Sequence, residues 1–255
     1  MPAPQNRWIV TPRPTPGARL RLVCFAYAGG NSSAFRTWPE ALPAEVELVA
    51  IELPGRQARS REPLLDRLPP LVAAMTDDVA GAIAPPFAIF GHSLGAQVGL
   101  GFAHELRRRQ LPGPVHLFAS AKRAPQLPER APMRSLPDPE LVDALRAMGG
   151  IPDGVLADAE LMAYFLPILR ADIAISETAD VAGEAPLPCP ITALGGIADE
   201  RAMPEEIEPW RELTSAGFER VLFPGGHFFI QTERAAVLAV LSRRLSGIVA
   251  GLPGR

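Results

Sequence analysis

Short apolar runs recur along the chain, and most of the intervals between them have room for a helix. The runs cover residues 20–26, 46–52, 87–91, 115–120, 190–195 and 220–223, and each has the length of a strand. Segments with helical periodicity fill most of the intervals, at 33–41, 67–84, 94–109, 205–215 and 232–248. This alternation predicts the α/β class, with a mainly parallel sheet and helices on both faces.

The interval 122–190 breaks this rhythm. It has helix-like segments near 138–148 and 158–179 and no strand pattern. We therefore expect a helical lid inserted into a single domain that spans residues 1–255. We expect most of the apolar residues of the insertion to pack onto the sheet and a smaller part to line a substrate channel. These residues are Leu136, Leu141, Leu145, Met148, Ile151, Leu161, Met162, Tyr164, Phe165, Leu166, Ile168 and Leu169.

The sequence G-H-S-L-G at residues 91–95 has the strongest chemical signal in the chain. It follows the apolar run 87–90 and precedes a helix-compatible segment, 96–109. A serine in this context sits on a sharp turn between strand and helix, with its hydroxyl exposed above the sheet edge. Ser93 is therefore the predicted nucleophile. The backbone N–H of Leu94, at the start of the helix, is a predicted donor to an oxyanion.

A serine hydroxyl needs a general base, and the chain has four histidines. His92 lies within the turn itself, His104 on the following helix, and His116 in a strand-like run, where structural or solvated roles are more plausible. His227 differs, because it follows the strand-like segment 220–223 and a Pro-Gly-Gly sequence. We predict that His227 is the base.

The acid that orients the base should come between serine and histidine in chain order. Asp199 fits best, because it follows the apolar run 191–194 and two glycines. Glu200 is its immediate rival. The shorter, stiffer aspartate is better suited to holding one imidazole tautomer, but the choice between the two carboxylates stays open.

A second oxyanion donor is expected in the loop after the first long strand. Residues 24–32 read C-F-A-Y-A-G-G-N-S, and the paired glycines allow the backbone to approach a substrate closely. The backbone near Ala28 is the predicted donor. Asn31 or Ser32 is expected to cap a helix that begins near Ser33.

Several of these motifs together resemble the stand-alone (type II) thioesterases of polyketide and nonribosomal peptide biosynthesis, members of the α/β-hydrolase superfamily. The resemblance covers nearly the whole chain and extends to medium-chain fatty acid thioesterases of animals. It rests on F-A-Y-A-G-G at 25–30, Phe35, Trp38, L-P-G-R at 53–56, Arg59, Glu62-Pro63, G-H-S-L-G at 91–95 and G-G-H-F at 225–228. The sequence departs from the family at Ala26, where proline is common, and at Ala198-Asp199-Glu200, where Asp-Asp or Asp-Pro is frequent.

The resemblance implies a Ser93–Asp199–His227 triad that works through an acyl-enzyme. It also implies a substrate carried on the phosphopantetheine arm of an acyl or peptidyl carrier protein, and an editing role that clears stalled or wrongly primed acyl groups. No metal or cofactor is expected. Two alternatives remain open: a general carboxylesterase or lipase acting on small oxygen esters, and a hydrolase-fold protein that binds a carrier protein without catalysis.

Composition narrows the choice of partners. The net charge of −3 gives no overall attraction to nucleic acid. Two groups of arginines, at 56, 59 and 61 and at 107–109, are candidate basic patches for an acidic carrier protein or ordinary solvated surface. Cys24 and Cys189 read as small buried residues, not as a disulfide. The proline-rich residues 1–17 lack a signal-peptide core, and no apolar stretch could span a membrane, so we expect a cytoplasmic protein.

Overall fold

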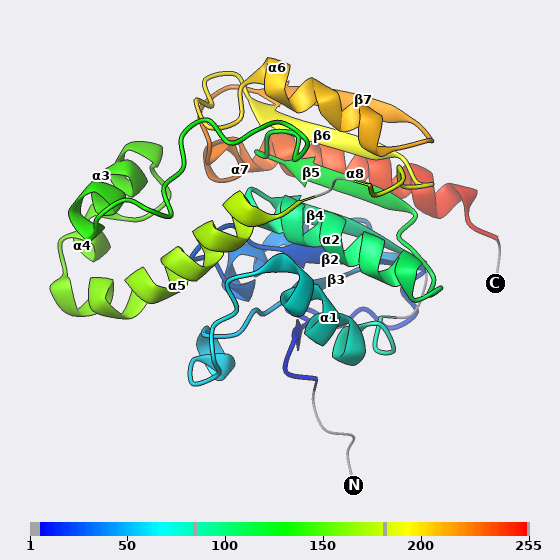
Figure 1. Ribbon diagram of the computed structural model, residues 1–255. Helices are drawn as coiled ribbons and strands as arrows, with labels where there is room; N and C mark the ends of the chain where they lie inside the picture. Colours follow the sequence, from blue (N-terminus) through cyan, green and yellow to red (C-terminus); the bar gives the residue numbers. More distant parts are fainter. Residues whose placement is uncertain (1–5, 84–85, 181–182, 254–255) are drawn as a thin grey trace, which may run out of the picture.

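The computed structural model describes residues 6–83, 86–180 and 183–253. Within these residues the centre of the molecule is one sheet of seven strands in the order β1-β3-β2-β4-β5-β6-β7 (Figure 1). Only β1 runs antiparallel to its neighbour, and the other strands are parallel. The strands are β1 (Ile9–Val10), β2 (Leu20–Phe25), β3 (Val46–Ile51), β4 (Phe87–His92), β5 (His116–Ser120), β6 (Ile191–Gly196) and β7 (Phe218–Phe223).

Helices cover both faces of the sheet, as Figure 1 shows for α2 on one face and α8 on the other. The mainly parallel α/β fold predicted from the sequence is confirmed. The α-helices are α1 (Leu68–Val79), α2 (Leu94–Arg108), α3 (Asp138–Met148), α4 (Asp153–Leu156), α5 (Ala159–Thr178), α6 (Pro204–Ile207), α7 (Phe229–Thr232) and α8 (Arg234–Gly251). The 3₁₀ helices are η1 (Ser32–Phe35), η2 (Trp38–Glu40), η3 (Gln57–Arg59) and η4 (Glu208–Leu213).

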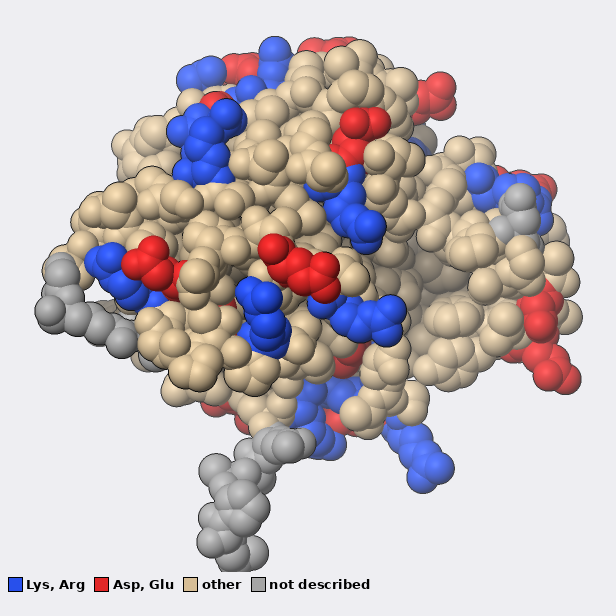
Figure 2. Space-filling view, turned by 180° about the vertical axis from the view of Figure 1, so that it is seen from behind, with Lys and Arg blue, Asp and Glu red and all other residues tan. Residues whose placement is uncertain are grey.

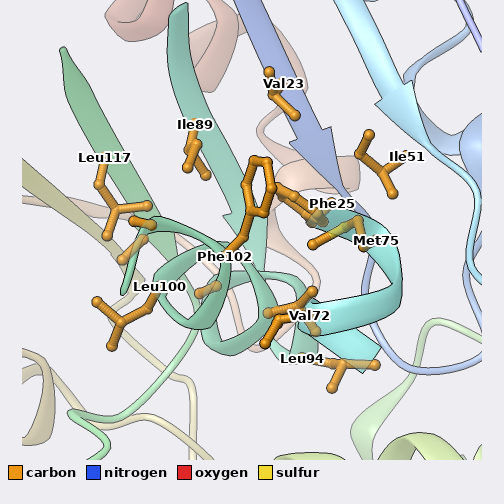
Figure 3. Close-up of a cluster of buried hydrophobic side chains, with 14 of the residues drawn as sticks. Val23, Phe25, Ile51, Val72, Met75, Ile89, Leu94, Leu100, Phe102 and Leu117 are labelled. Carbon is orange, nitrogen blue, oxygen red and sulfur yellow. The ribbon is translucent and has the colours of Figure 1, made fainter. Parts of the chain in front are cut away.

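Alternate residues of the central strands enter two separate cores. Val23 and Phe25 of β2 pack with α1 and α2, where Phe25 meets Phe102 at a ring-centroid distance of 6.1 Å (Figure 3). Leu22 and Cys24 point to the opposite face and pack with η1, η2 and α8. Both faces of the sheet are buried, which is why the parallel strands are continuously apolar in sequence.

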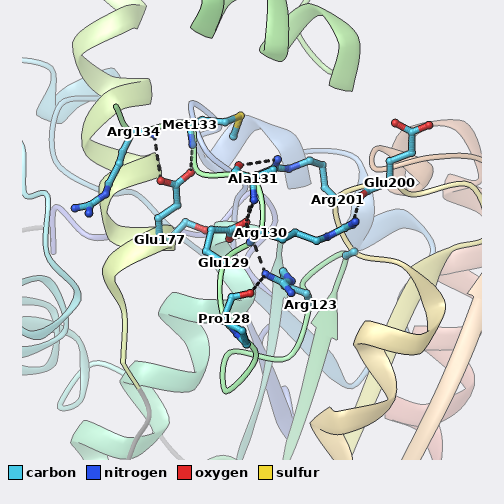
Figure 4. A network of polar contacts seen from close by, with 12 residues as sticks. Arg123, Pro128, Glu129, Arg130, Ala131, Met133, Arg134, Glu177, Glu200 and Arg201 are labelled. Carbon is cyan, nitrogen blue, oxygen red and sulfur yellow. Dashed lines mark hydrogen bonds and ion pairs between the residues drawn. The ribbon is translucent and has the colours of Figure 1, made fainter. Parts of the chain in front are cut away.

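The segment between β5 and β6 carries α3, α4 and α5, which project from one side of the sheet (Figure 1). These helices share a small core of their own, in which Leu141, Leu145 and Leu169 are buried. A polar network joins residues 128–134 of this segment to α5 and to the loop after β6 (Figure 4). In it, Glu177 of α5 accepts hydrogen bonds from the backbone N–H groups of Met133, at 2.6 Å, and Arg134, at 3.1 Å.

Some sequence predictions for the elements were wrong. The helix expected at 33–41 is two short 3₁₀ helices, with Pro39 inside the second, and the helix expected at 205–215 divides into α6 and η4, with Pro209 inside η4. A proline lacks the N–H that a continuing helix needs, which accounts for both divisions. The helix expected at 67–84 ends at Val79, and residue 84 lies outside the described residues. The short edge strand β1 was not predicted.

The idea that residues 56, 59 and 61 form one basic surface patch was also wrong. The side chains of Arg56 and Arg59 are buried, and Arg59 lies over the Trp8 ring, 3.7 Å from its centroid. The arginines at 107–109 are partly exposed, but each forms an ion pair with a carboxylate of Asp77, Glu105 or Glu184. Acidic and basic groups are similarly interspersed on the face shown in Figure 2.

Candidate active site

Ser93 occupies a strained turn between β4 and α2. Its backbone angles are φ 55° and ψ −117°, a region that residues other than glycine rarely adopt. The turn is closely packed. A Cβ added to Gly91 would lie 2.1 Å from the carbonyl oxygen of Gly95, and one added to Gly95 would lie 2.1 Å from that of Phe25. The two glycines therefore permit the turn, and the turn exposes the serine hydroxyl at the carboxyl edge of the sheet.

Three predicted site residues come together at this edge, from the loops after β4, β6 and β7. His227 Nε2 lies 3.0 Å from Ser93 Oγ. On the other side of the ring, His227 Nδ1 lies 2.9 Å from Asp199 Oδ2 and 3.1 Å from Oδ1. The side chains of His227 and Asp199 are buried, whereas Ser93 is partly open. A proton on the serine hydroxyl thus has a direct path to an imidazole that is held by a carboxylate.

Asp199, and not its neighbour Glu200, contacts the histidine. Asp199 Oδ1 also accepts hydrogen bonds from the backbone N–H groups of Arg201, at 2.9 Å, and Ala202, at 3.2 Å. These two donors fix the rotamer of the carboxylate. Glu200 is exposed, its side chain extends away from the polar network in Figure 4, and its carbonyl oxygen accepts a hydrogen bond from Arg130.

The other three histidines are all buried, so the solvated alternative for them was wrong. His92 Nδ1 lies 2.9 Å from Ser120 Oγ, and burial holds the pKa of His92 well below its usual value. Burial also lowers the pKa of His104 and of His116 to about 4. His116 Nε2 lies 2.9 Å from Thr192 Oγ1. Each ring is therefore neutral at pH 7 and contributes to packing.

A cavity of about 60 Å³ reaches Ser93 and His227, and Ala28 and Leu94 lie in its wall. Leu94 is the first residue of α2, so its N–H has no acceptor within the helix and lies at the positive end of the helix dipole. The helix that follows the Ala28 loop is capped as predicted, because Asn31 Oδ1 accepts a hydrogen bond from the N–H of Ser33 at 2.9 Å. This helix is a 3₁₀ helix. Both predicted oxyanion donors thus border the space next to the serine.

The inserted segment supplies most of the apolar wall of this cavity. Leu145, Met148 and Ile151 line it together with Ile173 of α5. A cavity of about 200 Å³ adjoins it at Ala28 and runs between the loop 27–34 and the residues of α4 and α5. A wider cavity of about 570 Å³ approaches His227 from the side of Asp199. The molecule is visibly hollowed beside its projecting part in Figure 2.

Sequence reasoning missed residues that border the site from α5. Ser176 and Glu177 line the cavity with Ser93, and Asp172 contacts the loop that carries Ala28. A helix that runs over many turns gives no sign in its sequence of which face meets a catalytic loop. Arg56, the partner of Asp172, belongs to the L-P-G-R motif, which was the available signal.

No cluster of three or more His, Cys, Asp or Glu side chains that could hold a metal ion occurs among the described residues. Cys24 and Cys189 are both buried and free, in agreement with the prediction that they form no disulfide. In the part of the chain that the structure describes, no helix has the length and apolar character needed to cross a membrane.

Comparison with known proteins identifies the family. Residues 20–245 match the thioesterase domain family. The chain belongs to this family. The match takes in Ser93, Asp199 and His227, together with the whole inserted segment.

Several relatives of the thioesterase are similar over most of their length. It is 37% identical over 246 residues to the gramicidin S biosynthesis protein GrsT of Aneurinibacillus migulanus, with 96% of each chain covered. It is 34% identical to the medium-chain S-acyl fatty acid synthase thioesterase of Homo sapiens, with 84% of this chain and 82% of the relative covered. Among solved structures, RedJ from the prodiginine pathway of Streptomyces coelicolor gives a TM-score of 0.85 at 42% identity, covering 89% of this chain and 90% of RedJ.

These matches confirm the resemblance to type II thioesterases and the α/β-hydrolase fold predicted from the motifs. The thioesterase is a hydrolase that acts on acyl thioesters. The roles of individual residues, and the carrier of the acyl group, are separate questions that depend on the geometry described above.

Proposed function

We propose that the thioesterase releases acyl groups from the phosphopantetheine arm of carrier proteins through an acyl-enzyme on Ser93, with His227 as base and Asp199 as its orienting acid. The observation that carries the proposal is the continuous contact from Ser93 Oγ to His227 Nε2, at 3.0 Å, and from His227 Nδ1 to Asp199 Oδ2, at 2.9 Å. The apolar cavity beside the serine hydroxyl supplies the space for an acyl group.

The first half of the reaction transfers the acyl group to the enzyme. His227 takes the Ser93 proton while Oγ attacks the thioester carbonyl, and the carbonyl oxygen becomes an oxyanion. The N–H groups of Ala28 and Leu94 stabilise this charge. The tetrahedral intermediate collapses, the carbon–sulfur bond breaks, and His227 gives its proton to the leaving thiolate. Asp199 stabilises the imidazolium that exists between the two proton transfers.

The second half returns the enzyme to its starting state. Water replaces the thiol, His227 removes a proton from it, and the hydroxide attacks the acyl-enzyme carbonyl. The same two N–H groups hold the second oxyanion. Collapse of this intermediate breaks the bond to Ser93 Oγ, which takes the water-derived proton from His227, and the free carboxylic acid leaves. The original Ser93 proton has left with the thiol, and a proton from water has replaced it.

The carrier-bound substrate is supported by relatives and by the shape of the site. GrsT is named for gramicidin S biosynthesis and RedJ for the prodiginine pathway, and we infer that a carrier protein of a pathway of this kind presents the acyl group to this enzyme. The small cavity at Ser93 shares lining residues with two larger cavities, and we take these as the route of a long, narrow arm from the surface. We assign the protein an editing role in such a pathway and a cytoplasmic location, where its two thiols would stay reduced.

The test is hydrolysis of a panel of acyl groups, each presented as a carrier-protein thioester, as a thioester of a free small thiol and as an oxygen ester. Ser93→Ala is the control. We expect the fastest release from the carrier protein and no release by Ser93→Ala. Preference for the oxygen ester would instead make the protein a general esterase. Release that does not depend on Ser93 would refute the mechanism.

A further inference from the structure

A buried polar link joins the inserted segment to two loops of the core. Asp172 lies on α5, Arg56 in the loop after β3, and Gly29 in the loop after β2. Asp172 is only 2% exposed and Arg56 only 5% exposed. Their side chains form an ion pair between residues that are 116 positions apart in the sequence. Three segments far apart in the chain are thus fixed at one point.

This link holds the loop that carries Ala28 through one backbone N–H and one backbone carbonyl oxygen. Asp172 Oδ2 accepts a hydrogen bond from the Gly29 N–H at 2.7 Å. Arg56 Nε donates to the carbonyl oxygen of Gly30 at 2.9 Å, and its Nη1 donates to that of Pro54 at 2.7 Å. One carboxylate oxygen and one guanidinium therefore fix two peptide groups of this loop, Ala28–Gly29 and Gly30–Asn31.

Packing makes the position of this loop still more constrained. Gly29 has φ +72°, and a Cβ at this residue would lie 2.7 Å from Leu169 Cδ2 of α5. The Gly30 N–H donates to the Tyr27 carbonyl oxygen at 2.8 Å, which closes the turn around Ala28. The loop therefore lies directly against α5, with the ion pair beside it.

A buried ion pair is an expensive way to join two elements, because both charges lose their hydration. Burial raises the pKa of Asp172, while the charge and hydrogen bond of Arg56 and the Gly29 N–H oppose that rise. Apolar side chains of similar volume would hold α5 at least as well. They could not bind an N–H and a C=O of the adjacent loop, which is what these two residues do.

We propose that Asp172 and Arg56 are positioning residues of the reaction, which hold the loop so that the Ala28 N–H points at the developing oxyanion. This inference rests on the proposed function, which makes Ala28 an oxyanion donor. Neither side chain lines the cavity beside Ser93. Their effect is exerted on the transition state, because a hydrogen-bond donor displaced by about 1 Å can cost about a hundredfold in rate.

The experiment measures kcat, KM and the inhibition constant of an acyl trifluoromethyl ketone for Asp172→Ala and Arg56→Lys. Ser93 Oγ adds to the ketone carbonyl, and the carbonyl oxygen becomes the oxyanion that the loop would bind. Alanine removes the carboxylate oxygen that accepts hydrogen bonds from both the Gly29 N–H and the Arg56 guanidinium. Lysine keeps the charge of Arg56 but has no fork to reach three acceptors.

We expect kcat to fall about 10- to 100-fold in each variant, with KM little changed and ketone binding weakened by a similar factor. The double variant should lose no more activity than the less active of the two single variants, because either substitution releases the same loop. Glu47→Gln is the matched control. Glu47 pairs with Arg21 at 3.0 Å near the amino-terminal ends of β3 and β2, away from the carboxyl edge that carries Ser93. The Glu47→Gln substitution should therefore change none of these values.

A rise in KM with unchanged kcat and ketone affinity would overturn the inference. So would a loss of activity that only follows the loss of folded protein, measured by the thermal midpoint of each variant. These results are distinguishable from failure of the proposed function. If wild-type hydrolysis survives Ser93→Ala, the mechanism itself fails; if it depends on Ser93 while both variants match Glu47→Gln, only the positioning role fails.

Discussion

Replacement of Asp199 by asparagine tests the triad at its least obvious member. The Arg201 and Ala202 N–H groups both point at Oδ1, at 2.9 and 3.2 Å, so this position must remain an oxygen. The amide nitrogen of asparagine then takes the place of Oδ2, 2.9 Å from His227 Nδ1. Two N–H groups cannot face each other, so Nδ1 must become an acceptor. The proton of the neutral ring moves to Nε2, which faces Ser93 Oγ and can no longer accept its proton.

The expected loss in kcat is about 10⁴-fold, the effect of the same exchange in the serine proteases, where it also fixes the wrong tautomer. That factor corresponds to about 5.4 kcal/mol of transition-state stabilisation. The free energy of unfolding should change much less, because asparagine has almost the same volume and keeps both backbone hydrogen bonds to Oδ1.

The assay is release of thiol from an acyl thioester, followed with a thiol-reactive chromophore, at saturating substrate. Urea denaturation of the same samples reports the free energy of unfolding. Glu200→Gln is the matched control, because Glu200 is the adjacent carboxylate but is exposed, and the carboxylate hydrogen-bonded to His227 is that of Asp199. It should retain wild-type activity.

Two results would refute the reasoning. A loss of less than about tenfold in Asp199→Asn would mean that the tautomer of His227 is not controlled by this carboxylate. An equal or larger loss in Glu200→Gln would mean that the acid had been assigned to the wrong neighbour.

Three further predictions concern stability. Gly95→Ala should cost at least about 2 kcal/mol in urea denaturation, because its Cβ would lie 2.1 Å from a backbone oxygen; Gly113→Ala, with nothing within 4 Å, is the control and should cost far less. Ser93→Gly should be about 1 kcal/mol more stable than Ser93→Ala, since only glycine relieves the strain at φ 55°; equal stabilities would contradict this. Burial lowers the pKa of His104 and His116 from 6.5 to about 4, so the unfolded chain binds protons first. Stability should be complete above pH 6.5 and fall between pH 6.5 and 4, by at most about 1.4 kcal/mol per pH unit for each histidine. His116→Gln should flatten this fall, and an unchanged slope would speak against the assignment.

The parts of the fold that depend on local sequence were predictable. The apolar run 87–90, the two glycines around Ser93 and the following helix form one continuous segment, and the structure has β4, a turn and α2 there. The order of the triad candidates in the chain similarly limited the acid to two neighbours. The choice of Asp199 over Glu200 depends on which side chain the loop turns inward, which is set by the N–H groups of residues 201 and 202.

Features that depend on distant contacts were not predictable. Arg56 reads as a surface residue in sequence because arginine is usually solvated, and only the fold brings Asp172 to it from α5. The strand β1 has two residues and is defined by its pairing with β3, so no periodicity could reveal it. The prolines at 39 and 209 are visible in the sequence, and in the fold the missing N–H at each outweighs the apolar spacing that favours one longer helix.

The position of Asp172 on α5 affects how this family could be recombined. An inserted helical segment is an obvious part to exchange when the acyl pocket of such an enzyme is to be altered. Here the same helix lines the pocket with Ile173 and ties down the Gly29 loop with the preceding residue. A graft bounded at β5 and β6 would therefore leave Arg56 facing a new helix. The transferable unit is the insertion together with the L-P-G-R loop and the Ala28 loop.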